Sequence, residues 1–339
     1  MDITLLQETA QRMVAVGKGV LAADESHPTI GKRFAALGIE ASEENRRLYR
    51  QMFFCSPGLE EYISGVILFD ETIRQRSDDG TPFPELLDTK GIVPGIKVDS
   101  GAKPLAGHPG ETITEGLDGL RDRLGEYFEL GARFAKWRAV ISIGNGTPSR
   151  GCIEANAHAL ARYAALCQEA SIVPIVEPEV LMTGHHDIDR CESVTTDVLQ
   201  CTFSQLQCQG VLLEAMVLKP SMVISGSDAT AATVEEVALR TIRCLQNNVP
   251  AAIPGIAFLS GGQTDEDATA HLDAMNRRGP HPWNLTFSYG RALQTRAMKT
   301  WGGDPAALDS ASQAFLKRAS CNSAATRGAW EPSMEQTIA

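Results

Sequence analysis

Short apolar runs that end in a polar residue recur along the chain, and each is followed by a stretch with helical spacing. Runs of four to eight apolar residues that alternate with helices are typical of buried parallel strands joined by helical crossovers. Eight such runs are present, at residues 19–24, 64–70, 93–99, 133–138, 173–179, 214–219, 255–260 and 285–290. The pattern therefore predicts eight strand–helix units.

The segments between these runs carry independent helix signals. Thr233 and Glu236 form a capping-box pair before an apolar face. Gly131 closes a second apolar face, and Asp304 followed by Pro305 is typical of a helix start. Because no linker or change of composition interrupts the repeat, we expect a single α/β domain, a (β/α)8 TIM barrel, and not an open sheet.

The two ends of the chain depart from the repeat. Residues 1–20 have the spacing of an amphipathic helix, with charged side chains among apolar ones, which predicts an N-terminal helix and not a secretory signal. Residues 320–339 are polar with little periodicity, so we expect a flexible C-terminal tail in which Glu331 and Glu335 are solvated. Residues 1–319 are then the barrel domain.

Composition limits the possible binding partners and the cellular compartment of the protein. The 339-residue chain has a net charge of −11, which argues against nucleic acid or an anionic membrane surface as the main partner. No apolar run approaches the roughly 20 residues of a membrane span. The 8 cysteines include no CxxC pair, so we expect reduced thiols and a cytoplasmic protein.

The candidate chemistry lies at the ends of the expected strands, where the active sites of such barrels are built. Alternation along a strand puts Lys136 with Arg138, and Glu177 with Glu179, on common faces. The other polar residues at strand ends are Asp24, Lys97, Lys219, Ser260 and Arg291. A structural ion-pair network would explain these charges without any function, and so would solvated lysines, but three lysines at one barrel mouth favour a ligand site.

Two glycine-containing loops suggest a phosphate site. Ser260-Gly261-Gly262 follows the seventh run, and Gly290-Arg291 follows the eighth. Backbone N–H groups and a guanidinium after strands seven and eight match the usual phosphate site of such barrels, although either loop alone is equally compatible with a plain turn.

Metal and nucleotide cofactors are not expected. The 7 histidines show no HxH or HxxxH spacing, and the adjacent pair His185-His186 is more typical of a surface loop. No Walker or GxGxxG motif follows a strand. A barrel mouth rich in lysines and carboxylates, without metal or cofactor, favours covalent catalysis through an imine to a carbonyl substrate.

Motifs along nearly the whole chain resemble those of the class I fructose-bisphosphate aldolases. They include GKGVLAADES, EENRRLYRQ, GVILFDET, GIKVD, GETITEGLDGL, FAKWR, IVPIVEPE, LKPSMV, FLSGGQ, LTFSYGRALQ and WGG, in the family's order. The resemblance implies a TIM barrel, aldol cleavage of fructose 1,6-bisphosphate in glycolysis, gluconeogenesis or the Calvin cycle, and a homotetramer. A transaldolase-like transferase and a non-catalytic phosphosugar-binding scaffold remain as alternatives.

The resemblance also implies roles for individual residues. Lys219 matches the lysine that forms the Schiff base, and Glu177 matches the general acid and base. Asp24, Lys136 and Glu179 match the charged groups around the imine. One substrate phosphate would bind Ser260, Gly261, Gly262, Gly290 and Arg291. The other would bind Ser26, Thr29, Arg33, Lys97 and Arg138.

Three departures from the family pattern concern substrate preference and the C-terminus. Thr29 stands where a serine is common, and His27-Pro28 replaces smaller residues in the same loop. Many relatives end in a tyrosine that folds over the site, whereas the last tyrosine here is Tyr289. We therefore expect deletion of residues 332–339 to change turnover less than about threefold.

Overall fold

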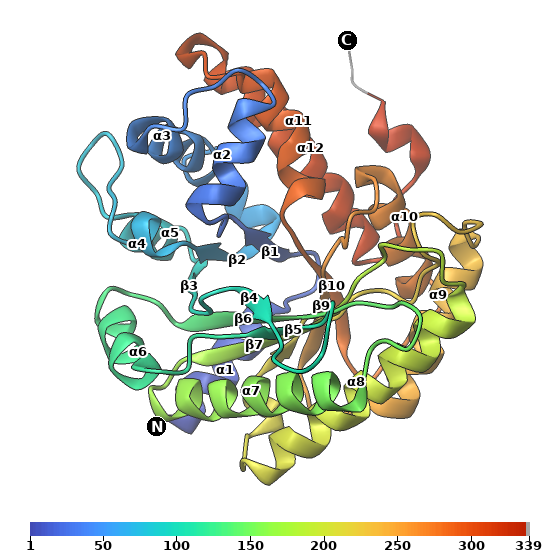
Figure 1. The fold of residues 1–339 in the computed structure, drawn as a ribbon. Coiled ribbons are helices and arrows are strands. Elements are labelled where there is room, and N and C mark those ends of the chain that lie inside the picture. The colour runs from blue at the N-terminus through green and yellow to red at the C-terminus, as the bar shows by residue number, and fades with distance from the viewer. Residues whose placement is uncertain (337–339) are drawn as a thin grey trace.

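Eight parallel strands form a closed barrel in the computed structural model, which describes residues 1–336 (Figure 1). Around the barrel the strands follow the order β1-β10-β9-β8-β7-β6-β3-β2. Each of the eight expected runs overlaps one of these strands, so the predicted (β/α)8 TIM barrel is confirmed. The strands are β1 (Gly19–Ala22), β2 (Ile63–Leu68), β3 (Val93–Lys97), β6 (Phe134–Ile141), β7 (Val173–Val180), β8 (Val217–Leu218), β9 (Gly255–Phe258) and β10 (Asn284–Tyr289).

The helices surround the barrel and cover its outer face (Figure 1). They are α1 (Ile3–Met13), α2 (His27–Ala35), α3 (Glu43–Phe54), α4 (Asp70–Ile73), α5 (Phe83–Thr89), α6 (Leu120–Glu129), α7 (Arg150–Glu169), α8 (Ile188–Cys208), α9 (Val234–Asn248), α10 (Asp265–Asn276), α11 (Arg291–Trp301) and α12 (Leu308–Ala325). Short 3-10 turns are η1 (Leu59–Glu61), η2 (Leu213–Ala215), η3 (Pro305–Ala307) and η4 (Pro332–Glu335). No helix among the residues that the structure describes has the length and apolarity needed to cross a membrane.

The helix signals of the sequence correspond to real helix ends. Thr233 is the N-cap of α9, and its hydroxyl accepts a hydrogen bond from the backbone N–H of Glu236 at 3.2 Å. Gly131 follows α6 with φ +102°, a conformation that a residue with a Cβ rarely adopts. Asp304 is the N-cap of η3, which leads directly into α12.

The N-terminal helix α1 closes one end of the barrel. Leu6, Ala10 and Met13 are fully buried and pack with interior side chains such as Val20 and Ile67. Burial of these apolar side chains explains the amphipathic spacing of residues 1–20. The helix leaves the carboxyl ends of the strands free for a site.

A two-stranded antiparallel hairpin, which the sequence did not indicate, follows β3. Its strands β4 (Ala102–Pro104) and β5 (Thr112–Thr114) are only three residues each. The hydroxyls of Thr112 and Thr114 donate to backbone carbonyls of β6 at 3.1 and 2.7 Å. The hairpin therefore lies beside the carboxyl end of β6, close to Arg138.

The expected boundary between residues 319 and 320 is wrong. Helix α12 continues to Ala325, and Cys321 and Asn322 are fully buried. Beyond it, Glu335 of η4 pairs with Arg318, which has no exposed surface. Apolar periodicity is missing because the consecutive residues 321–326 are all buried, and because Glu335 pairs with the buried Arg318. Residues 337–339 lie outside the described residues.

Candidate active site

The polar residues at the strand ends line one cavity of about 480 Å³ at the carboxyl end of the barrel. Parallel strands in a closed barrel bring their carboxyl ends together, so residues far apart in the sequence meet there. The cavity contains every sequence-predicted site residue except Gly262, which lies in the same loop as Gly261. The lining residues from the prediction are Asp24, Ser26, Thr29, Arg33, Lys97, Lys136, Arg138, Glu177, Glu179, Lys219, Ser260, Gly261, Gly290 and Arg291.

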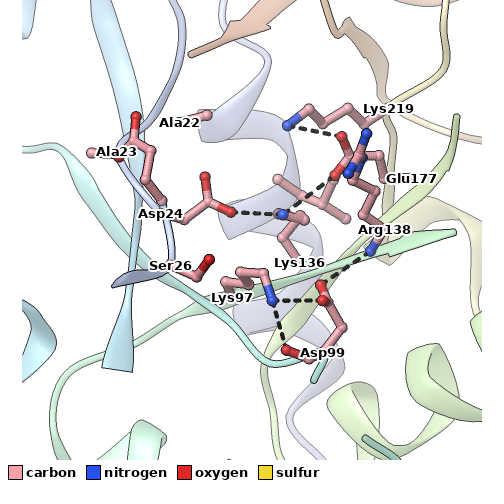
Figure 2. Close-up of polar contacts among 12 residues, drawn as sticks. Ala22, Ala23, Asp24, Ser26, Lys97, Asp99, Lys136, Arg138, Glu177 and Lys219 are labelled. Atoms are coloured by element: carbon pink, nitrogen blue, oxygen red, sulfur yellow. Dashed lines mark hydrogen bonds and ion pairs between the residues drawn. The ribbon is translucent and has the colours of Figure 1, made fainter. Parts of the chain in front are cut away.

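Two lysines and two carboxylates form the buried centre of this cavity (Figure 2). Lys219 Nζ lies 3.4 Å from Glu177 Oε1, and Lys136 Nζ lies 3.6 Å from Glu177 Oε2. Lys136 Nζ also contacts Asp24 Oδ2 at 2.6 Å. The side chains of Lys219, Glu177 and Lys136 are at most 5% exposed. Glu177 is thus shared between the two lysine side chains, because each of its oxygens faces a different lysine.

These charges shift each other's ionisation. Burial opposes the charged form of Asp24, but the positive charges of Lys136 and Lys219 outweigh it and lower the pKa of Asp24 below its ordinary value. Burial likewise opposes the charge of Lys136, but Asp24 and Glu177 outweigh it and raise the pKa of Lys136. The Asp24–Lys136 pair is therefore fully ionised at neutral pH.

A second group of charges surrounds Asp99, which the sequence analysis did not select. Lys97 Nζ contacts Asp99 Oδ1 at 2.5 Å, and the backbone N–H of Arg138 donates to Asp99 Oδ2 at 3.3 Å (Figure 2). The guanidinium of Arg138 pairs with Glu179. Asp99 ends the third apolar run, so its position was a signal that it belongs to the mouth. Its carboxylate therefore positions the side chain of Lys97 and the backbone of Arg138 at the cavity.

The loops after β9 and β10, where the sequence predicts that one phosphate binds, form a second side of the cavity. Gly261 and Gly262 have φ of +60° and +99°, so a side chain at either would strain the turn. A Cβ on Gly262 would lie 3.7 Å from Arg291 Nη2, which places this guanidinium beside the turn. Arg291 is also the first residue of α11. Backbone N–H groups, a helix N-terminus and a guanidinium thus converge here.

Ser288 is a further residue of this side that the sequence analysis missed. Its side chain lines the cavity, and its hydroxyl is buried without a hydrogen-bond partner within residues 1–336. The alternation of β10 places it on the same face as Thr286. A buried hydroxyl without a partner is suited to a hydrogen bond with a ligand.

The third side of the cavity is the start of α2. Ser26 is the N-cap and exchanges a hydrogen bond with the Thr29 hydroxyl at 3.1 Å. Arg33 pairs with Glu25 at 2.6 Å, and Glu25 lies 3.7 Å from the fully buried Arg50. The sequence analysis missed Glu25, although it directly follows Asp24. Glu25 holds Arg33 at the edge of the cavity.

The described part of the chain contains no cluster of three or more His, Cys, Asp or Glu side chains arranged to hold a metal ion. His185 is 84% exposed and lies 3.8 Å from Asp228, as expected for a surface loop. The polar groups that line the cavity are lysine amines, carboxylates, hydroxyls and guanidinium groups.

Comparisons with known proteins agree with this geometry. The family model for the glycolytic class I fructose-bisphosphate aldolases matches residues 5–339. A probable fructose-bisphosphate aldolase class 1 of Xanthomonas axonopodis pv. citri is 59% identical over 333 residues, which cover 98% of this chain and 100% of the relative. The cytosolic fructose-bisphosphate aldolase 6 of Arabidopsis thaliana is 54% identical, covering 93% of this chain and 88% of the relative.

A solved structure is also similar over nearly the whole chain. The fructose-bisphosphate aldolase of Plasmodium falciparum, crystallised with TRAP and a small-molecule inhibitor, superposes with a TM-score of 0.95. It is 48% identical in sequence, and the match covers 97% of this chain and 95% of that one. The closed barrel, the buried lysine cavity and these full-length matches show that the chain belongs to the class I fructose-bisphosphate aldolase family.

Proposed function

We propose that the protein is a lyase that reversibly cleaves fructose 1,6-bisphosphate to dihydroxyacetone phosphate and glyceraldehyde 3-phosphate, with Lys219 forming a Schiff base. The observation that carries this proposal is the position of Lys219: its side chain is 4% exposed, inside a cavity, and 3.4 Å from a carboxylate. A buried amine beside a proton acceptor is the arrangement that a carbonyl-attacking lysine needs.

Imine formation uses Lys219 and Glu177. The amine nitrogen forms a bond to the C2 carbonyl carbon, and the carbonyl oxygen takes a proton to become a hydroxyl. Glu177, close to Lys219 through one oxygen and to Lys136 through the other, is placed to accept the amine proton and return it to that hydroxyl. Loss of water then leaves a positively charged imine.

Cleavage follows because the imine accepts electrons. A base removes the proton of the C4 hydroxyl, the C3–C4 bond breaks, and its electron pair moves into the imine to form an enamine while the aldehyde leaves. Asp24 and Glu177 are the carboxylates nearest to the lysines and serve as this base. Lys136, kept charged by Asp24, stabilises negative charge that develops on oxygen. Protonation of the enamine and hydrolysis release the second product.

Two groups of potential phosphate-binding residues suit a substrate with a phosphate at each end. The turn Ser260–Gly262 with Gly290 and Arg291 would hold one phosphate, and Ser26, Thr29, Arg33, Lys97 and Arg138 would hold the other. A transferase that needs only one substrate phosphate would not require both groups. The two groups are provided by different elements, so each phosphate can be tested separately.

The direct test is reduction of the imine in place. Incubation with dihydroxyacetone phosphate and borohydride should inactivate the protein and leave a stable adduct on Lys219, located by peptide mass spectrometry. Lys219→Met should form no adduct, and EDTA should leave the reaction unchanged because imine formation needs no metal. An adduct on Lys97 or Lys136 alone, with Lys219→Met still active, would contradict the proposal. A scaffold without catalysis would form no adduct.

We further propose that the protein works in the cytoplasm as a homotetramer. Relatives from Arabidopsis thaliana are named as cytosolic, and all eight cysteines are unpaired, as in a reducing compartment. The only support for the tetramer is that members of this family typically form tetramers. Light scattering of the purified protein tests it, and a mass near 36.5 kDa in solution would show a monomer instead.

A further inference from the structure

The turn Ser260–Gly262 is anchored by the residue that follows it. The backbone N–H of Gln263 donates to the carbonyl of Ser260 at 3.0 Å and closes the turn. The side chain of Gln263 then reaches two elements that are distant in the sequence. Its Oε1 lies 2.6 Å from Nδ1 of His271 in α10, and its Nε2 donates to the sulfur of Met222 at 3.6 Å.

Both partners of Gln263 are rigidly held. His271 is 5% exposed, and Met222 is 1% exposed. Because Oε1 is an acceptor in this arrangement, Nδ1 of His271 must carry the proton, an assignment that follows from the hydrogen bonds. Burial lowers the pKa of His271 despite the opposing charges of Asp267 and Glu235, so the imidazole is neutral at pH 7.

Met222 connects this arrangement to the imine lysine. It stands three residues after Lys219 in the segment that leaves β8. In the same place the backbone N–H of Leu259 donates to the carbonyl of Pro220 at 3.1 Å. Gln263 therefore bridges the anion-binding turn on one side and the segment after Lys219 on the other.

We propose that Gln263 and His271 are positioning residues that set the distance between the Ser260–Gly262 turn and Lys219, so that a phosphate held by the turn presents the neighbouring carbonyl carbon to the amine. This inference rests on the proposed function. Two consecutive glycines give the turn little stiffness of its own, because glycine has the largest conformational freedom to lose. The side-chain contacts of Gln263 supply the missing constraint.

A purely structural role makes a different prediction. If the contacts only stabilised the barrel, their loss would lower the unfolding temperature and reduce all activities in parallel. If they position the turn, their loss weakens binding of phosphate while imine chemistry on a substrate without phosphate continues. The two readouts separate these roles.

The test compares Gln263→Leu and His271→Leu with His271→Asn, whose side-chain amide can place an N–H close to the position of Nδ1. We expect both leucine variants to raise KM for fructose 1,6-bisphosphate and the inhibition constant of inorganic phosphate by about five- to tenfold, as for loss of one buried hydrogen bond. Their kcat for fructose 1,6-bisphosphate should fall by a similar factor, because the carbonyl carbon is no longer held in line with the amine. His271→Asn should restore near wild-type values.

A second histidine–glutamine pair offers a matched control. His158 Nδ1 lies 3.2 Å from Gln205 Oε1 between α7 and α8, at an exposed site outside the cavity. His158→Leu should change neither constant. Gln263 is only half-buried, so Gln263→Leu carries the test if His271→Leu does not fold.

Failure of the positioning role and failure of the proposed function give different experimental outcomes. Trapping of unphosphorylated dihydroxyacetone by borohydride should be equal in wild type and the leucine variants. Unchanged KM and phosphate inhibition in both leucine variants, or an equal loss of dihydroxyacetone trapping, would overturn the inference. Failure of the wild-type protein to form any adduct would instead overturn the proposed function.

Discussion

Glu177 faces a lysine with each of its oxygens, Lys219 at 3.4 Å and Lys136 at 3.6 Å. The same carboxylate therefore contacts both lysines, and a proton can reach either of its oxygens. An amide at this position would keep the shape of the side chain but could not accept the proton. Replacing Glu177 by glutamine therefore separates substrate binding from proton transfer.

For Glu177→Gln we expect kcat to fall by roughly 10² to 10⁴-fold, the usual contribution of a general acid or base. KM should change little, because the phosphate-binding cations are untouched. Steady-state cleavage of fructose 1,6-bisphosphate measures both constants, with the exposed Glu214→Gln as control. Turnover within threefold of the wild type would remove Glu177 from its role.

The ionised pair of Asp24 and Lys136 links stability to pH. The pKa of Asp24 is lower in the folded protein than in the unfolded chain, where it is about 3.9. Its stabilising contribution is thus fully present above that value and is lost as the pH falls below it. A substitution that removes the charge of Asp24 should lower the stability of the protein at neutral pH and have no effect on it in acid.

We therefore expect Asp24→Asn to unfold at a lower temperature than the wild type at pH 6 to 7, and the difference to shrink as the pH falls below about 4. Scanning fluorimetry across this range measures the difference. Asp88→Asn, at an exposed site in α5, serves as control. A difference that stays constant or grows in acid would contradict the assigned direction of the pKa shift.

At the scale of the elements, local signals in the sequence identified helix ends well because capping is a local interaction. The Thr233–Glu236 pair was expected and is present at the start of α9. Strand lengths were harder to predict from the sequence. Strand β8 comprises only Val217–Leu218, although its apolar run is six residues long. Strand length depends on pairing with neighbours, and a single run does not encode it.

Loss of the α9 cap gives a prediction at this scale. Thr233→Ala removes the acceptor of the Glu236 N–H and should lower the free energy of unfolding by about 1 kcal/mol. Thr230→Ala changes an exposed threonine in the same loop and should have no such effect. Both are compared by thermal or urea unfolding, and equal stability of the two variants would show that the cap contributes nothing.

At the scale of the whole molecule, the C-terminal segment joins α10, α11 and α12. Arg318 donates to the carbonyl of Asp265 at 2.8 Å and pairs with Glu335, whose Oε2 lies 3.6 Å from Arg296. Helices α11 and α12 lie side by side (Figure 1). The expectation of a solvated tail was therefore wrong for Glu335, and deletion of residues 332–339 would leave the Arg318 charge unpaired.

We expect Glu335→Gln to destabilise the protein by roughly 3 kcal/mol, because removing one partner of a buried ion pair leaves an uncompensated charge. Glu331→Gln is the matched control, since Glu331 is 64% exposed and pairs with Arg277 at the surface, where a pair contributes about 1 kcal/mol or less. Thermal unfolding of both variants measures the contrast. Equal unfolding temperatures would show that Glu335 does not stabilise Arg318.

The sequence by itself determined the barrel and most of its mouth. Eight apolar runs, each ending in a polar residue, specify eight buried strands, and closure of such a barrel brings Asp24, Lys136, Glu177 and Lys219 to one end. This part was predictable because the position of a residue relative to its own strand is a local property.

Only the tertiary structure decided which charges pair. The ion pairs Lys97–Asp99 and Arg318–Glu335, and the contact of Asp99 with the backbone N–H of Arg138, were not indicated by any periodicity. Gln263 likewise meets its partner in α10 through the path of the chain after β9. Pairing requires atoms to come within about 3 Å, and such distances depend on barrel closure, side-chain rotamers and packing of several elements together. The pattern of apolar and polar residues along the chain does not determine these distances.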